Sequence, residues 1–136
     1  MAVEKLDPGS LAAVLNEVAA GNSDAAMAQF LVTDSKNWIE SSGLRELQFS
    51  ESEFLALGKS DRSWLQEASI QRCQDIKTLA MLVLDAALEE KANGNAELSQ
   101  KYTEAVNQLG EQLQEADVTL VFQQLGEFLA NAKPGE

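Results

Sequence analysis

The stretch that decides the fold is residues 61–92, which read DRSWLQEASIQRCQDIKTLAMLVLDAALEEKA. Apolar residues recur here every three or four positions, which is the period of a helix with a buried face. Asp85 is the only polar residue between Leu79 and Leu88. The pattern predicts one helix over Asp61–Ala92 that is surrounded by neighbours in its C-terminal half. Its two apolar stripes are Leu65, Ala68, Ile76, Leu79, Val83, Ala87 and Ile70, Cys73, Ala80, Leu84, Leu88.

The segment that follows predicts a second long helix, antiparallel to the first. The short turn-forming run Asn93-Gly94-Asn95 suits an antiparallel helical hairpin, and Asn95 is a good N-cap for a helix over Asn95–Ala116. The apolar residues of this helix form a narrow seam, which is typical of packing against one antiparallel neighbour. Asp117 or Thr119 then begins a last helix. The seam residues are Leu98, Tyr102, Val106, Leu109 and Leu113.

The N-terminal half predicts shorter helices with recognisable starts. Asp7 as N-cap and Pro8 at the first helical position begin one helix, which Gly21-Asn22 ends. Ser23 begins the next helix, and Thr33 is a second start that leads to Trp38 and Ile39. Ser50 and Glu53 have the spacing of a capping box and predict a short helix that Gly58 ends, while residues 44–49 are either loop or a helical turn.

No segment alternates apolar and polar residues with the β-branched enrichment of a half-buried strand. The sequence therefore predicts an all-α fold: a single-domain bundle of five or six helices over residues 1–136. A long antiparallel helical hairpin is its spine, and residues 1–6 and 132–136 are expected to fray.

Composition excludes several functional classes. Ten Lys plus Arg stand against 22 Asp plus Glu, which gives a formal net charge of −12 and argues against nucleic-acid binding through a basic face. The chain contains no histidine, which is the commonest general base and transition-metal ligand. Glu-x-x-His, EF-hand and phosphate-loop motifs are also missing, so we expect no metal, no cofactor and no enzyme activity.

The cellular compartment is predicted from the first ten residues, the longest apolar run and the single thiol. The first ten residues have no apolar core of a secretory signal, and the longest apolar run, residues 76–88, is too short to span a bilayer. Cys73 has no partner for an intrachain disulfide, which favours a reducing compartment. We therefore expect a cytoplasmic protein that does not enter membranes.

The long helix holds the candidate binding residues Asp85, Arg72 and Lys77. No basic residue lies three or four positions from Asp85, so a buried Asp85 would need a distant partner, such as Arg45 or Arg62, or a proton. The simpler alternative, which we favour, places Asp85 on the exposed line of the helix. Cys73 lies on an apolar stripe and is expected to be a small buried hydrophobe, although Arg72 and Lys77 are near enough in sequence to lower the pKa of its thiol.

Two tryptophans and a short repeat have alternative interpretations. Trp38 and Trp64 are expected to be core anchors, but if both are exposed they would mark a partner site. The hexapeptide QLGEQL at 108–113 returns as QLGEFL at 124–129. Its glycines are costly inside helices, so either they mark a close helix crossing or the repeat is chance, which is the interpretation we favour.

Function is inferred mainly from charge and from missing catalytic groups. Residues 1–35 hold five acids and one base and residues 102–136 hold six acids and one base, whereas the middle is nearly balanced. If the terminal helices pack side by side, they form one acidic surface that would steer the chain to a basic protein partner. The simpler alternative, which we favour, is that the net charge keeps a small protein soluble, which needs no partner.

The sequence thus favours a non-catalytic protein–protein interaction module, namely an adaptor, an inhibitor or immunity-type protein, or a chaperone-like protein. Its apolar surface could also support a homodimer. The alternatives are an enzyme or small-ligand protein with a site near Asp85, Arg72 and Lys77, and an acidic DNA-mimicking inhibitor.

Overall fold

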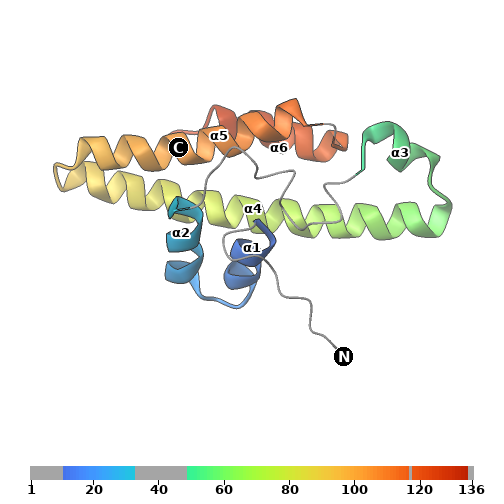
Figure 1. Cartoon of the computed structure of the whole chain (residues 1–136), viewed down its shortest axis with the longest axis horizontal. Helices are drawn as coiled ribbons and strands as arrows, with labels where there is room; N and C mark the ends of the chain where they lie inside the picture. Colours follow the sequence, from blue (N-terminus) through green and yellow to red (C-terminus); the bar gives the residue numbers. More distant parts are fainter. Residues whose placement is uncertain (1–10, 33–48, 117, 135–136) are drawn as a thin grey trace.

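The computed structural model describes residues 11–32, 49–116 and 118–134, which form helices and no strand (Figure 1). The prediction of an all-α bundle is confirmed. The helices are α1 (Leu11–Ala19), α2 (Ser23–Val32), α3 (Glu51–Ala56), α4 (Lys59–Ala92), α5 (Ala96–Glu115) and α6 (Leu120–Ala130).

The hairpin of α4 and α5 forms as predicted, with bounds that differ by no more than two residues. Gly94 adopts a φ of 86°, in the left-handed region that residues with a Cβ rarely enter. The Asn95 N–H donates to Glu90 O at 2.8 Å, and the Asn95 side-chain amide donates to a Glu90 carboxylate oxygen at 2.6 Å. The turn therefore satisfies the last carbonyls of α4 while it reverses the chain.

Helices α5 and α6 lie on one side of α4, whereas α1 and α2 pack on its opposite side (Figure 1). The described helices of the two terminal segments, α1 and α2 on one side and α5 and α6 on the other, are consequently separated by α4. The condition for one shared acidic surface, terminal helices that lie side by side, is not met.

The first apolar stripe of α4 forms the core as expected. Leu65, Ile76, Leu79, Val83 and Ala87 are all fully buried, and Ala68 is partly exposed. Ile76, Leu79 and Val83 belong to one buried cluster, which residues from the other helices complete: Val14 and Leu15 of α1, Ala26 and Phe30 of α2, Val106, Leu109 and Leu113 of α5, and Phe122, Leu125 and Leu129 of α6.

The second stripe is only partly covered, which corrects the prediction that the C-terminal half of α4 is surrounded. In that half Ala80 and Leu84 are buried, but Leu88 is 45% exposed; in the N-terminal half Ile70 is 47% exposed. Helix α4 has 34 residues and α6 has 11. At 1.5 Å per residue, α6 reaches along only about a third of α4, so the ends of the second stripe remain open to solvent.

The repeated hexapeptide has a structural role, so the chance interpretation is wrong. Gly110 of α5 and Gly126 of α6 are both buried and lie against each other where these helices cross. A Cβ added at Gly110 would come within 2.6 Å of Gly126 O and within 2.8 Å of Leu129 C, and it would lie closer still to Ala130 N. The two glycines therefore let the backbones of α5 and α6 meet directly.

Side chains from neighbouring segments complete several helix ends. The capping box at Ser50 and Glu53 is present, with hydrogen bonds of 3.2 Å and 3.1 Å, which confirms the predicted start of α3. The predicted end is wrong: α3 ends at Ala56 with Leu57 as its C-cap, and Gly58 is the N-cap of α4. The Asn107 side-chain amide of α5 donates to Leu129 O at 2.9 Å and to Ala132 O at 3.0 Å, which holds the C-terminal end of α6. The predicted cap at Asp7 and the start at Thr33 lie outside the described residues.

Candidate functional site

The structure does not gather Asp85, Arg72 and Lys77 into one site. All three lie on α4, where eight residues separate Lys77 from Asp85, or about 12 Å along the axis. None of them lines a cleft found among the described residues. Asp85 is exposed, in agreement with the simpler alternative. Arg62 lies on the same helix, about 35 Å away along the axis, so it cannot pair with Asp85. The other suggested partner, Arg45, is outside the described residues.

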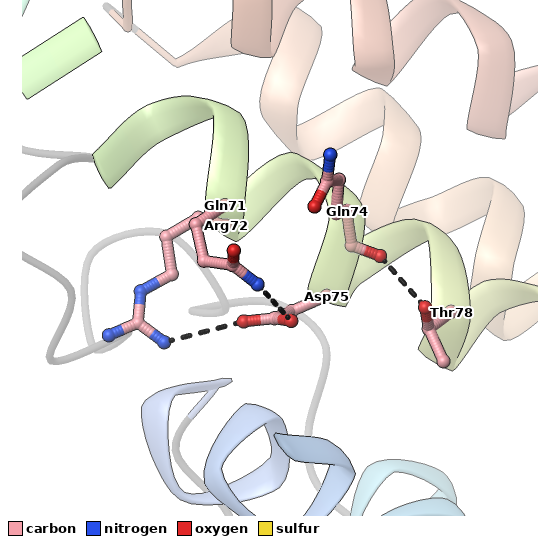
Figure 2. Close-up of polar contacts among 5 residues, drawn as sticks. All are labelled: Gln71, Arg72, Gln74, Asp75 and Thr78. Atoms are coloured by element: carbon pink, nitrogen blue, oxygen red, sulfur yellow. Dashed lines mark hydrogen bonds and ion pairs between the residues drawn. The ribbon is translucent and has the colours of Figure 1, made fainter. Parts of the chain in front are cut away.

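Arg72 instead belongs to a polar turn on the side of α4 that faces α1 (Figure 2). Its Nη1 atom lies 3.8 Å from a carboxylate oxygen of Asp75, and the Gln71 side-chain amide donates to the other oxygen at 3.1 Å. Such pairs within one helix contribute a few tenths of a kcal/mol. This turn therefore stabilises α4 locally.

Cys73 packs against the core with its thiol in the neutral form. Burial raises the pKa of the Cys73 thiol to about 11, and the positive charge of Lys77 opposes that rise. A nucleophilic cysteine needs the opposite shift. Cys73 therefore behaves as a small hydrophobic residue, as expected, but it is only partly buried.

Trp64 is not a core anchor, which corrects the prediction for this residue. It is 45% exposed, whereas its neighbour Leu65 is fully buried. Successive residues of a helix point about 100° apart, so when Leu65 faces the core Trp64 turns away from it. Trp38 lies outside the described residues, and the pairing of the two tryptophans stays a prediction.

An exposed apolar strip runs along the seam between α4 and α6, and sequence analysis did not single it out. We call it the α4–α6 strip and define it as Ile70, Met81, Val121 and Phe128. These side chains are 47%, 39%, 37% and 51% exposed, respectively. Ile70 and Val121 line the same cleft, and Met81 and Phe128 line the same groove farther along.

Lys77 of α4 contacts Phe128, at one end of the strip. Its ammonium nitrogen lies 5.4 Å from the centre of the Phe128 ring, within the range of a cation–π contact. The spacing from Ile70 to Lys77 and from Val121 to Phe128 is seven residues in each helix, so each pair lies on one helix face. The signal for this strip was therefore present in the sequence. The strip could not be recognised from this spacing alone, because the sequence does not reveal which apolar helix face has no helix packed against it.

Polar residues around the strip carry balanced charge. The groove at Met81 and Phe128 is also lined by Glu127 and Lys133, and Lys77 and Asp85 follow it along α4. Two positive and two negative charges therefore border the Met81–Phe128 end of the strip, in a chain whose net charge is −12. At the other end, Lys59, Arg62 and Glu51 line the same cleft as Ile70 and Val121.

A cleft of about 530 Å³ opens where α3, the start of α4 and the start of α6 meet. We call it the α3–α4–α6 cleft. Its apolar lining includes Phe54, Ile70 and Val121, and Lys59 and Arg62 bring two positive charges. The remaining lining residues are Glu51, Ser63, Gln66, Ser69 and Thr119.

Glu51 connects two walls of this cleft. Its Oε1 atom accepts a hydrogen bond of 2.9 Å from the Leu120 N–H, the first amide of α6. The N-terminal end of a helix carries partial positive charge, so a carboxylate there is favourable. Because α3 has no buried residue, this bond is a principal tie between α3 and the rest of the bundle.

Two hydroxyl groups at the cleft have no hydrogen-bond partner among the described residues. They are Ser69 Oγ and Thr119 Oγ1, and their residues are only 3% and 4% exposed. Thr119 is the N-cap of α6, yet its side chain makes no capping bond. A buried hydroxyl without a partner costs about 1–3 kcal/mol, which makes two in one cleft unusual. Nothing in the sequence distinguishes these residues from other serines and threonines.

Comparisons with known proteins add no functional residue: no protein-family model, no curated protein and no solved structure matches this chain. Within the described residues, no group of three or more cysteine, aspartate or glutamate side chains is placed to hold a metal ion. The same residues include no helix that is both long and apolar enough to cross a bilayer.

Proposed function

We propose that this chain is a non-catalytic binding protein, and that the α4–α6 strip receives an amphipathic helix of a protein partner. The observation that carries the proposal is the alignment of four exposed apolar side chains on two adjacent helices: Ile70, Met81, Val121 and Phe128. Large exposed apolar patches on monomeric proteins often mark interaction sites.

The shape of the strip supports a helical ligand. Residues 70 and 81 of α4 are about 16 Å apart along the axis, which equals three turns of a docked helix. Two parallel rows of side chains form the walls of a groove into which apolar residues spaced three and four apart can insert. Phe128, the only aromatic residue of the strip, would be the anchor because aromatic side chains dominate many interfaces.

The charges around the strip indicate whether its partner must be basic. Because Lys77 and Lys133 offset Asp85 and Glu127, a partner helix need not be basic. The apolar contacts should hold at high salt, which screens charge pairs but strengthens apolar association. This proposal departs from the basic partner expected from net charge alone.

Affinity capture from native lysate at low and at high salt tests the proposal. The bait variants are the wild type, the double variant Met81→Ser with Phe128→Ser, and the control Leu55→Ser. Leu55 is 59% exposed on α3, so the control removes an apolar side chain of the same kind away from the strip. We expect one stoichiometric partner at both salt concentrations with the wild type and the control, and its loss with the double variant.

Two outcomes would contradict the proposal. A partner that is lost at high salt but retained by the double variant would point to an acidic surface instead. Capture of only a second copy of the chain, lost with the double variant, would make the strip the interface of a homodimer.

We also propose that the protein is cytoplasmic, since its lone thiol has no disulfide partner within the chain.

A further inference from the structure

We propose that the α3–α4–α6 cleft binds a small amphipathic organic acid: an anionic group at Lys59 and Arg62, an apolar body, and a hydrogen-bonding atom at Ser69 and Thr119. This inference does not depend on the α4–α6 strip receiving a partner. The cleft shares Ile70 and Val121 with one end of the strip, but its proposed ligand is a small molecule, and binding is tested with the purified protein, in which no partner is present.

The size and lining of the cleft fit such a ligand. Small-molecule sites occupy about 300–1,000 Å³ and combine apolar walls with a few polar groups. The cleft has a volume of about 530 Å³, and Phe54, Ile70 and Val121 contribute its apolar surface. Helices α3, α4 and α6 each contribute a wall, so a ligand would contact three elements.

The charge of the cleft selects an anion. Lys59 and Arg62 are one helical turn apart at the start of α4, and neither makes an ion pair in the described part of the chain. The one carboxylate that lines the cleft, Glu51, is already engaged by the Leu120 N–H of α6. A carboxylate ligand could therefore approach both cations, and Arg62 offers paired donors that match it.

The two hydroxyls without partners require a second polar group on the ligand. Seven residues separate Arg62 from Ser69 on α4, or about 10 Å along the axis, so a compact anion cannot reach both ends of the cleft. Rotation about χ1 moves each hydroxyl oxygen among three staggered positions. A ligand oxygen at the α6 end would then provide the hydrogen bonds that Ser69 and Thr119 lack.

Three commercially available probes separate these contributions. The full probe is ω-hydroxydecanoate; decanoate lacks the distal hydroxyl, and decanol lacks the carboxylate. Affinities are measured by titration calorimetry, and amide chemical shifts of Ile70 and Leu120 report whether binding occurs at the cleft. We expect the full probe to bind about five- to tenfold more tightly than decanoate, the effect of one or two added hydrogen bonds, and more tightly than decanol.

Matched variants assign each contribution to its residues. Ser69→Ala with Thr119→Val should lower the affinity for the full probe to that for decanoate and leave decanoate unchanged. The folded state should be at least as stable as the wild type, because the substitutions remove buried hydroxyls that have no partner. Arg62→Gln should weaken both acids about tenfold and leave decanol unchanged.

The proposal is overturned if no probe binds at millimolar concentration, if the three probes bind equally, or if the double variant keeps the advantage of the full probe. It is also overturned if the chemical shifts of Ile70 and Leu120 do not move. Only the expected ranking, together with its loss in the matching variants, supports the site.

Discussion

Replacing Gly110 with alanine tests the crossing of α5 and α6, where the two backbones come into direct contact. The new Cβ would lie 2.6 Å from Gly126 O and 2.8 Å from Leu129 C. Real Cβ atoms do not approach atoms this closely. Because both neighbours are backbone atoms, no side-chain rotation relieves the overlap, and the helices must move apart.

Two opposing contributions set the size of the effect. Alanine is favoured over glycine by about 1 kcal/mol inside a helix. Overpacking a close contact costs about 1–3 kcal/mol, or more where the backbone must shift, as it must here. We therefore expect Gly110→Ala to lower the free energy of unfolding by about 2 kcal/mol. This corresponds to a fall in Tm of about 6–10 °C for a chain of this length.

Chemical denaturation followed by far-ultraviolet circular dichroism measures this change. Glu111→Ala is the matched control, because Glu111 is the next residue of α5 and is exposed, and we expect a change within about 0.5 kcal/mol. Gly126→Ala should resemble Gly110→Ala, and the double variant should lose less than the sum, since the first substitution already separates the helices. A Gly110→Ala protein as stable as the wild type would refute the reasoning.

Three further predictions concern other contacts. Glu51→Ala removes the acceptor of the Leu120 N–H, so we expect faster amide hydrogen exchange throughout α3 and a loss of global stability below about 1 kcal/mol; unchanged exchange in α3 would contradict this. Asn107→Asp should destabilise the fold more than Asn107→Ala, because a carboxylate would face the two carbonyls to which the amide now donates. The Tm values of both variants test this ranking. The raised pKa of Cys73, about 11, should lower its thiolate fraction near pH 8 about a hundredfold relative to a thiol with a pKa of 9.0. Because a thiolate of higher pKa is also more nucleophilic, we expect its reaction with a disulfide reagent to be about tenfold slower. Because the folded pKa is raised, the associated stability is present below about pH 9 and is lost as pH rises toward 11, which denaturation at a series of alkaline pH values measures.

The helices and their boundaries could be predicted because local chemistry sets them. The capping box at Ser50 and the turn at Gly94 act through neighbours in sequence, so the residues alone state where a helix begins or ends. The first stripe of α4 was likewise predictable, since a helix of this length must bury one face.

The two surface features depend on which helix packs beside which. Ile70 belongs to an apolar stripe in the sequence, but it is exposed because α6 covers only part of α4. The role of Gly110 and Gly126 required the crossing of α5 and α6 to be known. The cleft joins Glu51 to Leu120, residues far apart in the chain, and the missing partners of Ser69 and Thr119 are visible only in three dimensions. Sequence analysis thus concentrated on Asp85 and missed the residues that gather at the ends of α6.

Site-specific photocrosslinking in cells is the most direct test of the central claim, that the α4–α6 strip receives a protein partner. A photoreactive phenylalanine analogue replaces Phe128 in one variant and Glu104, an exposed residue of α5, in the other. The account predicts a crosslink to one heterologous protein from position 128 and none from position 104. A crosslink from position 104 alone, or from position 128 only to a second copy of the chain, would contradict it.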